Sequence, residues 1–144
     1  MIKKSVLMIL IVGAVAILMI IILFILTIFS TKKEVQILYF PKHDEEIFII
    51  NERKGLNYEL TAVTLSPSKK IKNLKNNSMI YSHGGALFYE QKEDTLLIYT
   101  ILKATIPDDL KTRTIIKQIE ISNPEYIELN KKYLEIGLNK FPNK

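Results

Sequence analysis

The sequence predicts an N-terminal transmembrane helix followed by a mainly-β domain of the β-rich α+β class. Residues 6–29 carry no charged side chain, and residues 34–121 break into short apolar runs separated by polar, Pro or Gly clusters. Residues 123–137 instead repeat apolar side chains at helical spacing. We therefore expect an antiparallel meander, sandwich or partly open barrel of about seven strands with one C-terminal helix.

Residues 6–29 suit a membrane-spanning helix in length and composition. A helix of this length extends roughly 36 Å, which is enough to cross a hydrocarbon core of about 30 Å. Thr27 is the only polar side chain in the run, and lysine pairs lie close to both of its ends. Because backbone polar groups in lipid must be paired internally, a helix is the form that a single spanning segment takes.

A cleavable signal peptide is the alternative interpretation of this segment. Residues 14–16 (Ala-Val-Ala) formally match a small-x-small cleavage pattern. Cleavage there would leave residues 17–29 as an apolar new N-terminus, and no such pattern follows the run, where Ile28 and Phe29 precede Ser30. We therefore expect a permanent anchor.

The chain then divides into a short N-terminal tail (1–5), the transmembrane helix (6–29), a basic juxtamembrane linker (30–33) and a membrane-proximal β-rich domain (34–144). Four linker residues extend only about 14–18 Å, so the domain is expected to lie at the membrane surface. Lysines on both sides of the helix leave the orientation open. A short tail before a long domain nevertheless favours a cytoplasmic N-terminus and an extracytoplasmic domain.

Turn signals divide the domain into its expected strands. Residues 34–40 alternate, with Val35, Ile37 and Tyr39 on one strongly apolar face. The other strands are expected at residues 46–50, 58–65, 79–81, 86–90, 95–106 and 114–121, the last with Ile115, Ile119 and Ile121 on one face opposite Gln118 and Glu120. The fourth and fifth of these seven strands flank Ser-His-Gly-Gly and should form a hairpin. The run 95–106 lacks alternation and should be a central strand buried on both faces.

The C-terminal segment predicts a helix. Asn123 supplies an N-cap, Pro124 stands at the first helical position, and Glu125 places an acid in the first turn. Gly137 can end the helix. The competing interpretation makes residues 133–138 a strand by alternation.

The charge and the cysteine count exclude several function classes. The formal charge is +5, but without the lysines at 3, 4, 32 and 33 the remaining 16 basic residues nearly balance the 15 acidic ones. The soluble part therefore lacks the concentrated positive field of a nucleic-acid-binding surface. The absence of cysteine excludes a disulfide framework, thiolate metal sites and a cysteine nucleophile.

Two polar clusters are candidate sites. Ser82 stands beside His83, but neighbouring residues on a turn point apart, and no nucleophile-elbow motif surrounds the serine. Residues 43–46 (His-Asp-Glu-Glu) form an acidic turn, but consecutive residues without a shaped loop do not supply the converging oxygens that a divalent cation needs. We predict no catalytic, cofactor-binding or metal-binding site.

The most polar stretch, residues 66–78, is expected to be an exposed loop. Near an anionic leaflet each lysine contributes about 1 kcal/mol of attraction. The loop is therefore a candidate contact for lipid headgroups or an acidic partner through Lys69, Lys70, Lys72 and Lys75.

The leading hypothesis is a non-enzymatic interaction module at the membrane surface, whose partners are the bilayer and another envelope or membrane protein. An accessory subunit of an envelope complex and an immunity-type protein both fit this description. The alternatives are a surface-acting hydrolase, which needs a histidine and several carboxylates in one pocket, and a carrier with an apolar cavity inside the sheet. No cofactor is implied.

Overall fold

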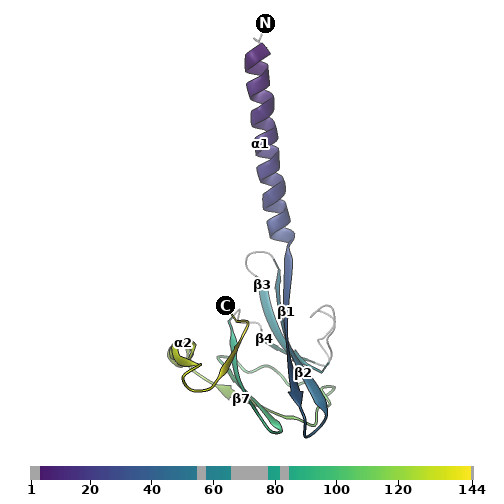
Figure 1. Ribbon diagram of the computed structural model, residues 1–144, viewed down its shortest axis with the longest axis vertical. Coiled ribbons are helices and arrows are strands. Elements are labelled where there is room, and N and C mark those ends of the chain that lie inside the picture. The colour runs from purple at the N-terminus through teal and green to yellow at the C-terminus, as the bar shows by residue number, and fades with distance from the viewer. Residues whose placement is uncertain (1–3, 55–57, 66–77, 82–84, 144) are drawn as a thin grey trace.

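The computed structural model describes residues 4–54, 58–65, 78–81 and 85–143. In these residues the chain forms a long N-terminal helix, two four-stranded sheets and a short C-terminal helix, as Figure 1 shows. The two sheets do not close into a barrel. The predicted β-rich α+β class is therefore confirmed.

Helix α1 (Lys4–Phe29) projects away from the sheets (Figure 1). Its central stretch, Met8–Thr27, has a mean hydropathy of 3.5, and none of this stretch is buried in the protein. The hydroxyl of Thr27 donates to the carbonyl of Leu23 at 2.9 Å, so the one polar side chain of this central stretch is satisfied within the helix. By length and composition α1 can cross a membrane, and a signal sequence would meet the same criterion.

The first sheet, sheet A, continues directly from the helix. Its strands are antiparallel in the order β1-β2-β3-β4, with β1 (Thr31–Phe40), β2 (Glu45–Lys54), β3 (Tyr58–Thr64) and β4 (Ser78–Tyr81). Only Ser30 separates α1 from β1. The strand therefore takes in residues 31–33 of the segment expected to be a linker.

The second sheet, sheet B, has the order β7-β6-β5-β8, with β5 (Leu87–Lys92), β6 (Thr95–Thr100), β7 (Ile115–Glu120) and β8 (Asn139–Phe141). Strand β5 is antiparallel to β6 and β8, but β7 is parallel to β6. The meander is therefore not purely antiparallel, because residues 101–114 return the chain to the starting end of β6.

Two expected strand arrangements are wrong. The predicted hairpin of residues 79–81 and 86–90 does not form, because β4 pairs with β3 in sheet A whereas β5 lies between β6 and β8 in sheet B. The expected strand 95–106 stops at Thr100, whose hydroxyl donates to the carbonyl of Leu102. Beyond Thr100, the side-chain amide of Gln118 in β7 forms hydrogen bonds with both the N–H and the carbonyl of Ala104.

The main hydrophobic core lies between the inner faces of the two sheets. Its fully buried side chains come from both sheets and include Phe40, Ile47, Ile49, Val63, Met79, Leu87, Leu96 and Ile98. Along β1 the inward residues are Leu38 and Phe40, whereas Val35, Ile37 and Tyr39 face outward. One strongly apolar side of β1 is therefore left outside the core.

Strand β7 directs a polar, partly buried side chain inward, which the predicted isoleucine face did not anticipate. Ile115 is exposed, while Ile116 packs on the core and Gln118 points inward. The amide oxygen of Gln118 accepts from the hydroxyl of Tyr81 at 2.9 Å and from the N–H of Ala104 at 2.8 Å. Its amide nitrogen donates to the carbonyl of Ala104 at 2.8 Å. These bonds remove the cost of burying the amide.

Helix α2 (Asn123–Lys132) confirms the predicted C-terminal helix. Its N-cap is Ser122, not Asn123, and Ser122 and Glu125 form a reciprocal capping box. The helix ends at Lys132, and Gly137, with φ of 77°, lies in the turn that leads to β8. The tyrosine ring at position 126 meets Phe88 of β5 edge-on, with 5.3 Å between centroids, which holds α2 against sheet B.

Candidate functional site

Strand β1 presents an open edge and an apolar outer surface. It is the terminal strand of sheet A, and among the described residues only β2 pairs with it. We call Val35, Ile37 and Tyr39 the outer stripe; these side chains are 45%, 52% and 49% exposed. An edge strand with exposed apolar side chains is a template for pairing with another chain.

The outer stripe continues across sheet A. Val35 lies opposite Ile50 and Ile37 opposite Phe48 in the register of β1 and β2. Both of these β2 residues belong to a second apolar cluster on this outer face, together with Ala62, Leu60 and Ile80. The outer face is thus apolar in composition from β1 to β4, but Phe48, Ile50 and Ala62 are themselves buried, so the outer stripe is the exposed part of it.

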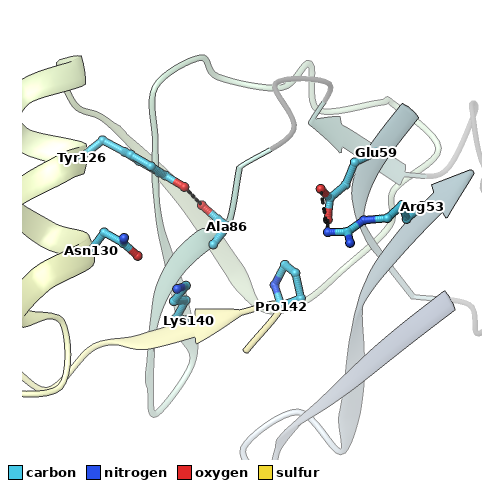
Figure 2. A pocket seen from close by; sticks show the side chains of 7 residues that line it. All are labelled: Arg53, Glu59, Ala86, Tyr126, Asn130, Lys140 and Pro142. Carbon is cyan, nitrogen blue, oxygen red and sulfur yellow. Dashed lines mark hydrogen bonds and ion pairs between the residues drawn. The ribbon is translucent and has the colours of Figure 1, made fainter. Parts of the chain in front are cut away.

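A polar pocket opens at the end of the domain nearest to α1. It has a volume of about 220 Å³ and is lined by Arg53, Glu59, Ala86, Tyr126, Asn130, Lys140 and Pro142. Figure 2 shows the arginine and the glutamate on one side, and the tyrosine and the asparagine of α2 on the other. The register places Arg53 between Lys32 of β1 and Glu59 of β3, close to the start of β1.

The ion pair in this pocket is loose. A single guanidinium nitrogen of Arg53, Nη2, lies 3.3 Å from each carboxylate oxygen of Glu59. Charge-assisted bonds of this kind are usually about 2.7–2.9 Å long. The two side chains are 38% and 16% exposed, so both remain accessible from the pocket.

The opposite wall of the pocket is fixed by Tyr126. Its hydroxyl donates to the carbonyl of Ala86 at 3.0 Å (Figure 2). Burial raises the pKa of Tyr126, and the negative charge of Glu59 adds to this increase. The hydroxyl therefore stays protonated at neutral pH. The effect of Glu59 on Tyr126 shows that the two side chains interact electrostatically across the pocket.

Glu45, at the start of β2, holds the segment before β7. Its carboxylate accepts four hydrogen bonds, from the hydroxyls of Thr112 and Thr114, both at 2.6 Å, and from the N–H groups of Arg113 and Thr114 at 3.2 and 3.0 Å. Burial would raise the pKa of Glu45, but these hydrogen bonds outweigh it and lower the pKa below its ordinary value. This carboxylate is a structural clasp between the sheets.

The acidic turn examined in the sequence does not converge on one point. Glu45 is directed to the β7 side, whereas Asp44 accepts a hydrogen bond from the hydroxyl of Tyr39 at 2.9 Å. Lys42 of the same turn pairs with Asp94. Within the described part of the chain, His, Asp and Glu side chains do not gather into groups of three suited to a metal ion.

The other sequence candidates lie outside the described residues. These are Ser82 and His83, and the lysines of the expected loop, Lys69, Lys70, Lys72 and Lys75. The predictions made for them stay predictions.

The polar pocket was missed by the sequence analysis, because its residues are spread from position 53 to position 142. One local signal was present. Arg53 and Glu59 flank Gly55 in the sequence, and a hairpin register centred there would pair them. Nothing local indicated that α2 and β8 would meet them.

Comparisons of this chain with protein-family models, with curated proteins and with solved structures found no match.

Proposed function

We propose that this chain is a single-pass membrane protein whose β domain lies at the membrane surface and binds another membrane or envelope protein without catalysis. The observation that carries the proposal is the direct passage from α1 to β1. An apolar helix that buries none of its central stretch in the protein needs an apolar surrounding, and the bilayer supplies one. One residue later, the chain enters an edge strand with an open apolar face.

Retention of α1 is supported by the pairing of the residues that follow it. Thr31 and Lys32 already pair with Lys54 and Arg53 of β2. A cleavage site beyond Thr31 would thus fall within a paired strand. Ile28 also occupies the position where a small residue is needed for cleavage after Ser30.

The binding surface that we propose is the outer stripe together with the edge of β1 opposite β2; at Tyr39 the strand's carbonyl also accepts a hydrogen bond from the side chain of Gln91. An extended segment of a partner can add to such an edge by backbone hydrogen bonds, while its side chains meet the stripe. We propose a cytoplasmic N-terminus and an extracytoplasmic domain, because the tail before α1 is short and the domain after it is long. An accessory subunit of an envelope complex or an immunity-type protein would use such a surface.

The partner is expected to be a different protein. Strand β1 continues from the C-terminal end of α1 and points away from the helix (Figure 1). Copies inserted in the same orientation in one membrane therefore have β1 strands that point in the same direction. A symmetric antiparallel β1–β1 pair requires opposite directions. A second copy in the same bilayer is therefore excluded from that mode of pairing.

The inter-sheet core argues against the alternative of an apolar-ligand carrier. Large side chains from both sheets are fully buried in the space that a ligand would need, and the sheets do not form a closed barrel. A carrier would keep that space open.

Site-specific photocrosslinking tests the proposed surface. The full-length chain, carrying a benzoylphenylalanine in place of Ile37, is illuminated in its native membranes. We expect a covalent adduct with one discrete protein of a different sequence, identified by mass spectrometry. The matched control places the same group at Leu134, which is 74% exposed but lies beyond α2. An adduct with a second copy only, no adduct, or identical adducts at both positions would contradict the proposal.

A further inference from the structure

We propose that the polar pocket of Figure 2 binds a zwitterionic lipid headgroup that carries a phosphate diester and a primary ammonium. This inference rests on the membrane anchoring of the proposed function, but it does not depend on a protein partner at β1. It is argued from the depth of the pocket, its charges and its size.

The depth follows from the strand register. Arg53 lies opposite Lys32, which is the third residue after the end of α1. At about 3.3 Å per strand residue, this level lies on the order of 10 Å beyond the helix. Polar headgroup layers extend about 5–8 Å beyond the hydrocarbon core on each side, and an arginine side chain adds further reach. On this estimate Arg53 lies close to the outer boundary of the headgroup layer.

The charges fit a ligand that carries both signs. Arg53 and Lys140 are cations that suit a phosphate, and Glu59 is an anion that suits an ammonium group. The present contact of Glu59 with Arg53 is long and uses one guanidinium nitrogen, so a phosphate can approach the other guanidinium donors. The side chain of Asn130 adds a neutral donor and acceptor from α2 (Figure 2).

Glu59 sets the choice between zwitterionic and anionic lipids. If a phosphate alone drew Arg53 away, the carboxylate of Glu59, which is largely buried, would lose a compensating charge. A ligand that brings an ammonium group gives the carboxylate of Glu59 a second cation and leaves Arg53 and Lys140 to the phosphate. A choline headgroup lacks the N–H donors that this carboxylate can accept.

The size of the pocket points to the headgroup alone. Its volume of about 220 Å³ lies below the range of about 300–1,000 Å³ that is usual for pockets enclosing a whole small ligand. The acyl chains of a bound lipid would remain in the bilayer beside α1. The shared chemistry is that of glycerophosphoethanolamine, which exists both as a lipid headgroup and as a soluble molecule.

Native mass spectrometry of the full-length chain in detergent micelles tests this inference. The chain is titrated with four probes: dihexanoyl-phosphatidylethanolamine, dihexanoyl-phosphatidylcholine, dihexanoyl-phosphatidylglycerol and glycerophosphoethanolamine. We expect the ethanolamine lipid to bind about five- to tenfold more tightly than each of the other three; relative to the choline lipid, this corresponds to about the net value of one hydrogen bond. This comparison uses the natural sequence and does not depend on the folding of a variant.

Two variants locate the selectivity. Glu59→Gln is expected to remove the preference for ethanolamine over choline, and Arg53→Gln to weaken both lipids. The matched control is the exposed pair Lys103–Glu120, 3.9 Å apart, where Lys103→Gln and Glu120→Gln should leave the preference unchanged.

Three results would overturn the inference. Equal binding of all lipids would show that the pocket is not a selective headgroup site. Tighter binding of phosphatidylglycerol would show that the site does not prefer a zwitterionic headgroup. Equal binding of glycerophosphoethanolamine and the ethanolamine lipid would show that the pocket recognises the soluble molecule as well as the lipid, which contradicts a lipid ligand. Any of these three results would leave the membrane anchoring of the chain unaffected, because membrane extraction measures the anchoring separately.

Discussion

Replacing Glu45 with alanine is expected to destabilise the β domain by about 2–4 kcal/mol. The carboxylate accepts four hydrogen bonds from residues 112–114 and ties β2 of sheet A to the segment that leads into β7 of sheet B. Thr114 is buried, so its hydroxyl would lose this acceptor without gaining free access to water, while its N–H would keep the hydroxyl of Thr112 at 3.0 Å as an acceptor. Denaturant unfolding of the full-length chain in micelles, followed by tyrosine fluorescence, measures the change.

The neighbouring residue provides a matched control. Glu46 has the same side chain on the opposite face of β2 and is exposed. Glu46→Ala should change the free energy of unfolding by no more than about 0.5 kcal/mol. If the two variants were equally stable, the clasp would not be a stabilising feature.

The contribution of Glu45 is also expected to depend on pH. Its hydrogen bonds lower its pKa in the folded state, so the stabilisation is fully present above the unfolded value of about 4.3. It is lost as the pH falls through the lower folded value, because protonation then becomes possible in the native state. The difference in unfolding free energy between the natural chain and Glu45→Gln should therefore shrink from pH 6 towards pH 3. A difference that grew on acidification would contradict this assignment.

Two charges in α1 are expected to remove the chain from the membrane. Val15 and Leu18 lie near the middle of the apolar stretch, and their side chains are exposed. Each arginine at the centre of a membrane helix costs about 2.5–3.5 kcal/mol on the insertion scale. In the double variant Val15→Arg, Leu18→Arg, most of the chain should leave the membrane fraction, as measured by immunoblotting after ultracentrifugation.

The matched control keeps both positions apolar. Val15→Leu with Leu18→Val preserves the total side-chain volume and hydropathy, and the chain should remain in the membrane fraction. Full retention of the arginine variant would show that the β domain, not α1, attaches the chain to the membrane.

Local patterns predicted the elements of this fold better than their pairing. The apolar run before Phe29 and the capping residues before α2 act through their own neighbours, so α1 and α2 could be placed from the sequence. The pairing of β4 and β5 depends on which strands compete for their edges. The short Gly-rich connection suggested a hairpin, but β4 pairs with the strand before it, β3, and β5 pairs with β8 from far along the chain.

The direction in which side chains face was also decided by distant partners. Gln118 faces inward because the hydroxyl of Tyr81 and both backbone groups of Ala104 satisfy its amide, and a strand pattern does not contain that information. The apolar side of β1 carrying Ile37 faces outward for a similar reason, since the opposite side carries Phe40 into the core. The polar pocket required α2 and β8 to meet the β2–β3 pair, which only the tertiary structure brings about.

Sodium carbonate extraction of membranes containing the natural chain, followed by intact-mass measurement, tests the membrane anchoring most directly. We expect the protein to stay in the membrane pellet at alkaline pH, with a mass close to 16.6 kDa that includes α1. Release into the supernatant, or a shorter chain that begins after Phe29, would contradict the proposal that α1 holds the β domain at the membrane surface.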